Sequence, residues 1–138
     1  MWDLKDKTVV ITGATNGIGK AAALELAKQG PKLLLTFRNQ ELADNLLAEI
    51  KTAAPDVSVE LIYCDFSMQS SIRECSKEIV ASQDKIDVLI NNAGVVNTSY
   101  HETSEGIENT FAVNHLGYFL FTNLLLNKMK GPEESRII

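Results

Sequence analysis

The chain has 138 residues, of which 45% are apolar and 22% charged, a composition typical of one globular domain with a sizeable core. Its formal net charge of -5, without a basic cluster, argues against nucleic acid or an anionic membrane as the main partner. The polar residues 1–7 leave no room there for a signal peptide or a membrane anchor, so a cytoplasmic protein is expected.

A glycine-rich turn follows the first predicted strand, residues 8–12, which is apolar on both faces like a central strand of a parallel sheet. Gly13 suits a tight turn, Gly17 has no Cβ to obstruct a pyrophosphate, and Gly19 allows the next helix to settle against its strand. The start of that helix offers free N–H groups and a positive dipole end to phosphates. The predicted cofactor-binding residues of the turn are Thr12, Gly13, Thr15, Asn16, Gly17, Ile18 and Gly19.

The spacing of this turn distinguishes it from other glycine loops. Thr12 followed by G-x-x-x-G-x-G resembles the T-G-x-x-x-G-I-G of the short-chain dehydrogenase/reductase family. A Walker A loop is one alternative, suggested by Gly19-Lys20, but it needs Gly at position 14 and Ser or Thr at position 21, and both are alanine. A purely structural glycine turn is the other alternative.

Arg38 follows the second predicted strand, residues 32–36, and lies 19 positions after Gly19. In dinucleotide folds the residue about 20 positions past the turn faces the adenosine ribose, where an acidic residue binds a 2′-hydroxyl and an arginine suits a 2′-phosphate. A planar guanidinium matches phosphate oxygens, so NADP is favoured over NAD. The alternative is an exposed arginine that starts a helix. The family resemblance also favours NADP.

Three further elements follow in chain order. The first helix is expected to bury Ile18, Ala22 and Leu26 and to end at Gly30-Pro31. A second helix is predicted from Leu42, Leu46, Ile50 and Ala53, with Asn39 as its N-cap. Residues 57–63 alternate apolar and polar, which predicts a strand at a sheet edge and a strand order of 3-2-1-4. The fold class is therefore α/β, a doubly wound parallel sheet of the Rossmann type.

Asp65 comes directly after this edge strand and resembles the family aspartate that hydrogen-bonds the adenine amino group. The alternative is a turn or capping aspartate. The next helix carries an apolar stripe that includes Met68, Ile72, Cys75 and Ile79, and we interpret this stripe as core. Cys75 is accordingly expected to pack in the core and to have no redox role.

The segment Asn91-Asn92-Ala93-Gly94 follows the fourth predicted strand, residues 86–90, and resembles the N-N-A-G of the same family. Small residues suit a backbone that passes under the cofactor ribose, and an Asn amide can tie neighbouring strands together. Asn92, Ala93 and Gly94 are therefore predicted to bind cofactor. The loop that follows contains Ser99, Tyr100 and His101, but adjacent residues do not supply triad geometry, and ligand spacing for a metal is lacking.

Residues 103–130 resemble the family's fifth helix, and Asn114 matches the asparagine of an Asn-Ser-Tyr-Lys catalytic tetrad. In the family this asparagine bends the helix, and its main-chain carbonyl holds a water in the proton relay. The sequence around Asn114, residues 113–120, is similar to that of the retinol-dehydrogenase-like branch. The helix is apolar nearly all round, which predicts burial on two sides, and the resemblance implies a homodimer through 103–130.

The resemblance implies one NAD(P)-binding domain over 1–138, truncated at the start of a fifth strand, Arg136-Ile137-Ile138. The tetrad Ser, Tyr and Lys are lacking, since no tyrosine of the chain has a lysine four positions later. The implied activity is hydride transfer between a nicotinamide dinucleotide and a small-molecule carbonyl or alcohol in the complete protein, without nucleic acid or metal. The alternative is a naturally truncated, non-catalytic protein that binds a nucleotide or a partner chain.

Overall fold

Five parallel strands form one sheet in the order β3-β2-β1-β4-β5 in the computed structural model, which describes residues 3–131 and 134–138. Met1 and Trp2 of the polar N-terminal segment lie outside the described residues. The central strand β1 pairs on both sides, with Val9 opposite Leu33 and also opposite Val88. The strands are β1 (Thr8–Ile11), β2 (Lys32–Phe37), β3 (Ser58–Tyr63), β4 (Val88–Ile90) and β5 (Arg136–Ile137).

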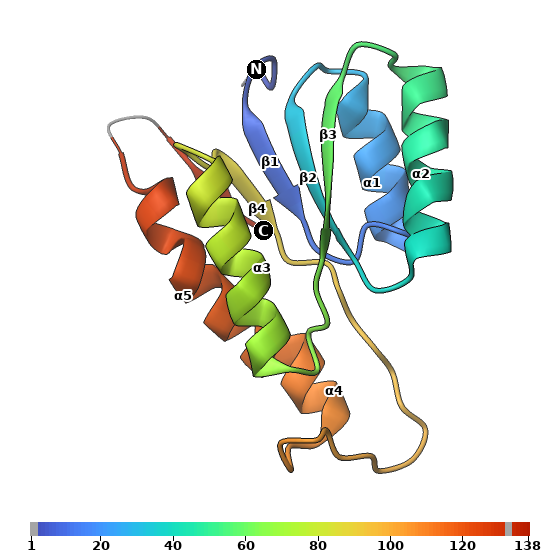
Figure 1. Cartoon of the computed structure of the whole chain (residues 1–138), viewed down its shortest axis with the longest axis vertical. Coiled ribbons are helices and arrows are strands. Elements are labelled where there is room, and N and C mark those ends of the chain that lie inside the picture. The colour runs from blue at the N-terminus through green and yellow to red at the C-terminus, as the bar shows by residue number, and fades with distance from the viewer. Residues whose placement is uncertain (1–2, 132–133) are drawn as a thin grey trace.

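Helices cover both faces of the sheet, as Figure 1 shows: α1 (Gly17–Ala27) and α2 (Gln40–Ala53) lie on one side, α3 (Gln69–Ser82) and α5 (Gly117–Met129) on the other. Two apolar clusters result, because alternate residues of the buried strands point to opposite faces. Val9 and Ile11 of β1 join the cluster under α1 and α2, whereas Val10 joins the cluster under α3 and α5. The predicted doubly wound α/β fold and the edge position of β3 are confirmed.

The buried face of α1 differs from the prediction. Ile18 is 83% exposed, and the buried residues are Gly19, Ala23 and Ala27. The helix thus turns its smallest side chains to the sheet, because these allow its backbone to approach β1 and the glycine turn closely. In α2, Leu46 and Ile50 are buried as expected, but Leu42 is 40% exposed.

The segment predicted as one helix over 103–130 is divided. After a loop closed by a bridge between Glu102 and Glu108, α4 (Asn109–Phe111) leads into a π-helical segment, η1 (Ala112–Leu116), and then into α5. Within one chain α5 buries one face, where Phe121 and Leu125 are fully buried, whereas Phe119 is 68% exposed on another. The predicted second buried side, which the resemblance assigns to a homodimer interface, stays a prediction. No helix among residues 3–131 and 134–138 is long and apolar enough to cross a membrane.

Candidate functional site

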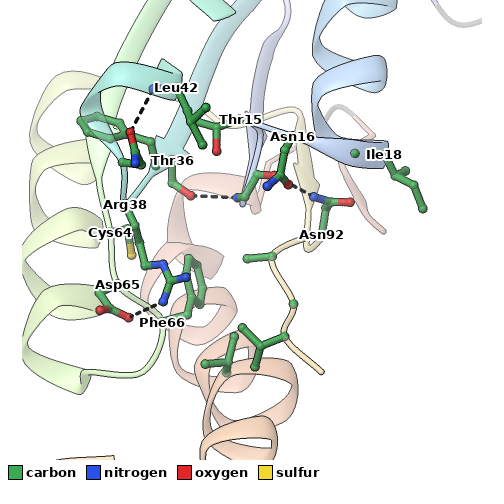
Figure 2. A pocket seen from close by; sticks show the side chains of 18 residues that line it. Thr15, Asn16, Ile18, Thr36, Arg38, Leu42, Cys64, Asp65, Phe66 and Asn92 are labelled. Atoms are coloured by element: carbon green, nitrogen blue, oxygen red, sulfur yellow. Dashed lines mark hydrogen bonds and ion pairs between the residues drawn. The ribbon is translucent and has the colours of Figure 1, made fainter. Parts of the chain in front are cut away.

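A cavity of about 570 Å³ opens at the carboxyl ends of β1, β2, β3 and β4 (Figure 2). This is the edge where doubly wound folds bind ligands, beside the strand at which the order reverses. All predicted site residues line it except Thr12, Gly19 and Asn114. The lining residues are Gly13, Thr15, Asn16, Gly17, Ile18, Thr36, Phe37, Arg38, Asn39, Leu42, Cys64, Asp65, Phe66, Asn92, Ala93, Gly94, Val95 and Val113.

Several lining residues were not predicted from the sequence. Thr36, Phe37, Cys64 and Phe66 stand at or just beyond the ends of β2 and β3. Their position at strand ends was the available signal, because the carboxyl ends of parallel strands share one edge of the sheet. Val113 comes from the π-helical segment, and no local pattern indicated that this segment reaches the cavity.

Thr12 lies behind the cavity wall and joins the glycine turn to the end of β4. Its fully buried hydroxyl accepts hydrogen bonds from the backbone N–H groups of Asn92 and Ala93, each at 2.9 Å. In return, the Asn92 side-chain amide donates to the carbonyl oxygens of Thr12 and Gly13, both at 3.0 Å. The two predicted motifs are therefore one hydrogen-bonded unit, and Thr12 supports the wall without lining it.

The glycines of the turn meet different surroundings. Gly13 has φ +63°, and a Cβ there would lie 2.7 Å from the Cα of Ala93. A Cβ on Gly19 would lie 2.5 Å from the Gly13 carbonyl oxygen and would overlap the Asn92 amide nitrogen. A Cβ on Gly17 would meet nothing within 4 Å. Gly13 and Gly19 therefore permit close internal packing, whereas Gly17 faces open space in the cavity.

The start of α1 provides groups suited to phosphate. Asn16 is extended at the N-cap and makes no side-chain capping hydrogen bond, and the first turn of α1 has no acidic residue. The first N–H groups of a helix lack intrahelical partners and lie at the positive end of its dipole. Because Asn16, Gly17 and Ile18 line the cavity, these groups are next to it. The residues present therefore fit the pyrophosphate of a dinucleotide.

Arg38 and Asp65 occupy the other end of the cavity and approach each other, with 4.0 Å between Nη1 and Oδ1 (Figure 2). The sequence showed no acidic neighbour for Arg38, and the fold supplies one from the end of β3. The Asp65 carboxylate also accepts hydrogen bonds from the N–H and hydroxyl of Ser67, at 2.9 and 2.7 Å. Asp65 therefore has the turn contacts of the structural alternative as well as a place in the cavity wall.

Asn114 lies within the π-helical segment, outside the cavity lining. Its side chain pairs with the backbone of Val95, donating to the carbonyl oxygen at 2.8 Å and accepting from the N–H at 2.9 Å. The widened π turn is a local distortion of the helix, as the resemblance implied for this position. The Asn114 side chain thus holds Val95, the residue after Gly94, while the backbone of Asn114 remains part of the π-helical segment.

The Cys64 thiol stands at the cavity wall and is shielded from solvent. Cys64 lines the cavity but is buried, and the pKa of its thiol is raised, first by a hydrogen bond with Cys75 and then by burial. A protonated, buried thiol is a poor nucleophile. Cys75 lies in the core, as predicted. No group of three His, Cys, Asp or Glu side chains that could hold a metal ion occurs within the described part of the chain.

The loop after β4 is exposed at Ser99 and His101, as expected for a solvated loop. Ser99 Oγ lies 2.9 Å from His101 Nε2. Both side chains are exposed, and neither lines the cavity.

Comparisons with known proteins agree with this architecture. The family model described as short chain dehydrogenase matches residues 7–138. Human retinol dehydrogenase 13 is 43% identical over 132 residues, which cover 96% of this chain and 40% of that protein. Human retinol dehydrogenase 11 is 43% identical over 98% of this chain and 42% of its own length. The chain therefore spans about two fifths of these curated relatives.

A solved structure shares the fold and has a nucleotide bound. A metagenomic short-chain oxidoreductase in complex with NADP superposes with a TM-score of 0.85 at 28% identity. The match covers 99% of this chain and 62% of that chain.

Proposed function

The chain belongs to the short-chain dehydrogenase family, and from this premise we propose that it is the cofactor-binding part of an NADP-dependent oxidoreductase. The observation that carries the proposal is the joint lining of one cavity by the start of α1, Arg38, Asp65 and the Asn92 to Gly94 segment. The family binds nicotinamide dinucleotides, whose bound nicotinamide supplies or accepts a hydride. The substrate class is a small-molecule carbonyl or alcohol, a proposal supported by the names of the retinol dehydrogenase relatives.

Each end of the dinucleotide has its own residues in this proposal. The turn from Gly13 to Gly19 holds the pyrophosphate with the free N–H groups of α1, and Thr15 and Asn16 supply polar side chains beside it. Asp65 receives the adenine amino group. Ala93 and Gly94 present a small backbone surface to the nicotinamide ribose, while Asn92 and Thr12 keep that surface in register with the turn.

The preference for NADP rests on Arg38. Its side chain is 59% exposed and lines the cavity, so its guanidinium is accessible to a 2′-phosphate. A guanidinium forms charge-assisted, bidentate hydrogen bonds to phosphate oxygens, which the 2′-hydroxyl of NAD cannot replace.

The domain organisation and assembly are proposals of the same kind. Residues 1–138 form one dinucleotide-binding domain, and Asn114 is its contribution to the catalytic tetrad. The exposed face of 103–130 carries Phe119 and a stacked pair, Phe111 and His115, with ring centroids 5.1 Å apart. Exposed aromatic side chains on one helical segment support a homodimer interface there.

Replacing Arg38 tests the proposed function directly. Arg38→Ala is expected to weaken NADPH binding at least about tenfold and NADH binding less than about twofold, because only the former loses a charge-assisted contact. Isothermal titration of both nucleotides measures this. Arg73→Ala, which removes an exposed arginine of α3 away from the cavity, is the matched control. Equal losses for both nucleotides would remove Arg38 from the 2′-phosphate site, and no binding by the unaltered chain would contradict the function itself.

A further inference from the structure

The ion pair inside the cavity joins the two residues that the proposed function assigns to the adenosine end. Arg38 follows β2 and Asp65 follows β3, two neighbouring strands whose register places their carboxyl ends side by side. The Nη1 to Oδ1 distance is 4.0 Å. The pair therefore lies where the ribose 2′ position is proposed to bind.

The two partners are unequally restrained. The Asp65 side chain is only 19% exposed, and its Oδ1 accepts two hydrogen bonds from Ser67. Its backbone N–H donates to Ser71 Oγ at 2.9 Å, which fixes the main chain as well. Arg38, by contrast, extends from a strand end with 59% of its side chain exposed. The carboxylate is thus the fixed charge, and the guanidinium is the group that can be shared.

We propose that Asp65 sets the strength of the 2′-phosphate preference by sharing the charge of Arg38, an inference that rests on the proposed NADP site. A 2′-phosphate must compete with the carboxylate for the guanidinium, whereas a 2′-hydroxyl has no such competition. Asp65 therefore moderates selectivity through Arg38, and neutralising it strengthens binding of the phosphorylated nucleotide. Asp65 acts here as a positioning residue for Arg38, in addition to its contact with adenine.

The test uses two adenosine nucleotides that lack the nicotinamide half. Adenosine 2′,5′-bisphosphate and adenosine 5′-monophosphate are titrated into the full chain and into Asp65→Asn, Arg38→Gln and the double variant. Asparagine keeps the size of aspartate and an acceptor oxygen for Ser67. The ratio of the two Kd values is expected to shift about three- to tenfold toward the bisphosphate in Asp65→Asn. In the Arg38→Gln background the same change is expected to shift the ratio less than about twofold.

Two further variants sharpen the test. Glu60→Gln removes a carboxylate from β3, the strand that precedes Asp65, but one that pairs with Lys32 at 2.7 Å and does not line the cavity. It is expected to leave the ratio unchanged. Asp65→Ser removes the same charge with a different side chain, and it is expected to shift the ratio in the same direction as Asp65→Asn.

Several outcomes would overturn the inference. An equal shift with and without Arg38 would show direct repulsion of the phosphate by Asp65. An unchanged ratio in both Asp65 variants, or loss of both nucleotides by both, would limit Asp65 to adenine binding or folding. If the unaltered chain prefers the bisphosphate but Asp65 has no effect, the inference alone fails. If the unaltered chain binds neither nucleotide, the proposed function fails with it.

Discussion

The helices α1 and α2 both begin directly after an asparagine, and they use it differently. Asn39 caps α2, because its side chain accepts a hydrogen bond from the N–H of Leu42 at 3.0 Å. Asn16 has a similar extended backbone at the start of α1 but forms no capping hydrogen bond. A side chain of the protein therefore caps the first backbone N–H groups of α2. The first N–H groups of α1 have no such side-chain cap and lie beside the cavity. Local helix stability is exchanged there for a place that can bind an anion.

The largest expected effect comes from adding a side chain at Gly19, where α1 packs closely against the glycine turn and Asn92. Gly19→Ala is expected to destabilise the protein by about 2–5 kcal/mol, because the new Cβ overlaps Asn92 and the Gly13 carbonyl, which share a hydrogen bond. Chemical denaturation measures the change. Gly131→Ala is the matched control, since a Cβ there meets nothing within 4 Å. A loss below about 1 kcal/mol would show that the turn can relax around the methyl group.

Asn16→Asp places a carboxylate at the start of α1, whose first turn has no acidic residue. A carboxylate at this position interacts favourably with the helix dipole, so a gain of about 0.5 kcal/mol in the free energy of unfolding is expected. The same charge repels the dinucleotide phosphates, and NADPH binding is expected to weaken about tenfold. Titration of NADPH against Asn16→Asp and the neutral Asn16→Ala separates charge from the loss of the amide. Unchanged binding in Asn16→Asp would place the phosphates elsewhere.

Asn39→Ala removes the side-chain cap of α2, a cap that α1 does not have. The free energy of unfolding is expected to fall by about 1 kcal/mol, because the N–H of Leu42 loses its partner. Asn16→Ala, which breaks no capping hydrogen bond, is expected to change it by less than about 0.5 kcal/mol. Equal losses in the two variants would remove the distinction between these helix starts.

The smallest effect concerns α4, whose start is capped by a titratable group. The Glu108 carboxylate accepts hydrogen bonds from the N–H groups of Thr110 and Phe111 at 2.8 and 2.7 Å, and these lower its pKa. A lowered folded-state pKa means that the cap contributes fully above the ordinary glutamate pKa and is lost as the pH falls through the folded value. NMR shifts of these two amides are expected to follow that titration, and to lose it in Glu108→Gln. If the amide shifts of Thr110 and Phe111 in the unaltered chain do not change as the pH falls, Glu108 does not cap α4.

Local sequence patterns were sufficient for the elements and the main motifs. Apolar runs of strand length, the Asn39 cap and the glycine turn after the first strand depend on short-range geometry, which neighbouring residues largely specify. The order 3-2-1-4 followed from comparing an apolar central strand with an alternating edge strand. The prediction that an Asn amide at this strand end can tie neighbouring strands together agrees with Asn92, which follows β4 and donates to the carbonyl oxygen of Thr12, just after β1.

Tertiary structure alone decided the features that join distant segments. Periodicity located α1 but gave the wrong buried face, because close packing against the turn favours Gly19 and Ala23 over the larger Ile18. The side chain of Asn114, in the π-helical segment, pairs with the backbone of Val95, 19 residues earlier, and the local pattern did not indicate this contact. The approach of Arg38 to Asp65 requires β2 and β3 to be paired in register. The sequence by itself determined the fold class and the local motifs, whereas only the packed sheet decided which charges and backbone groups share the cavity, since these contacts exist only after distant strands align.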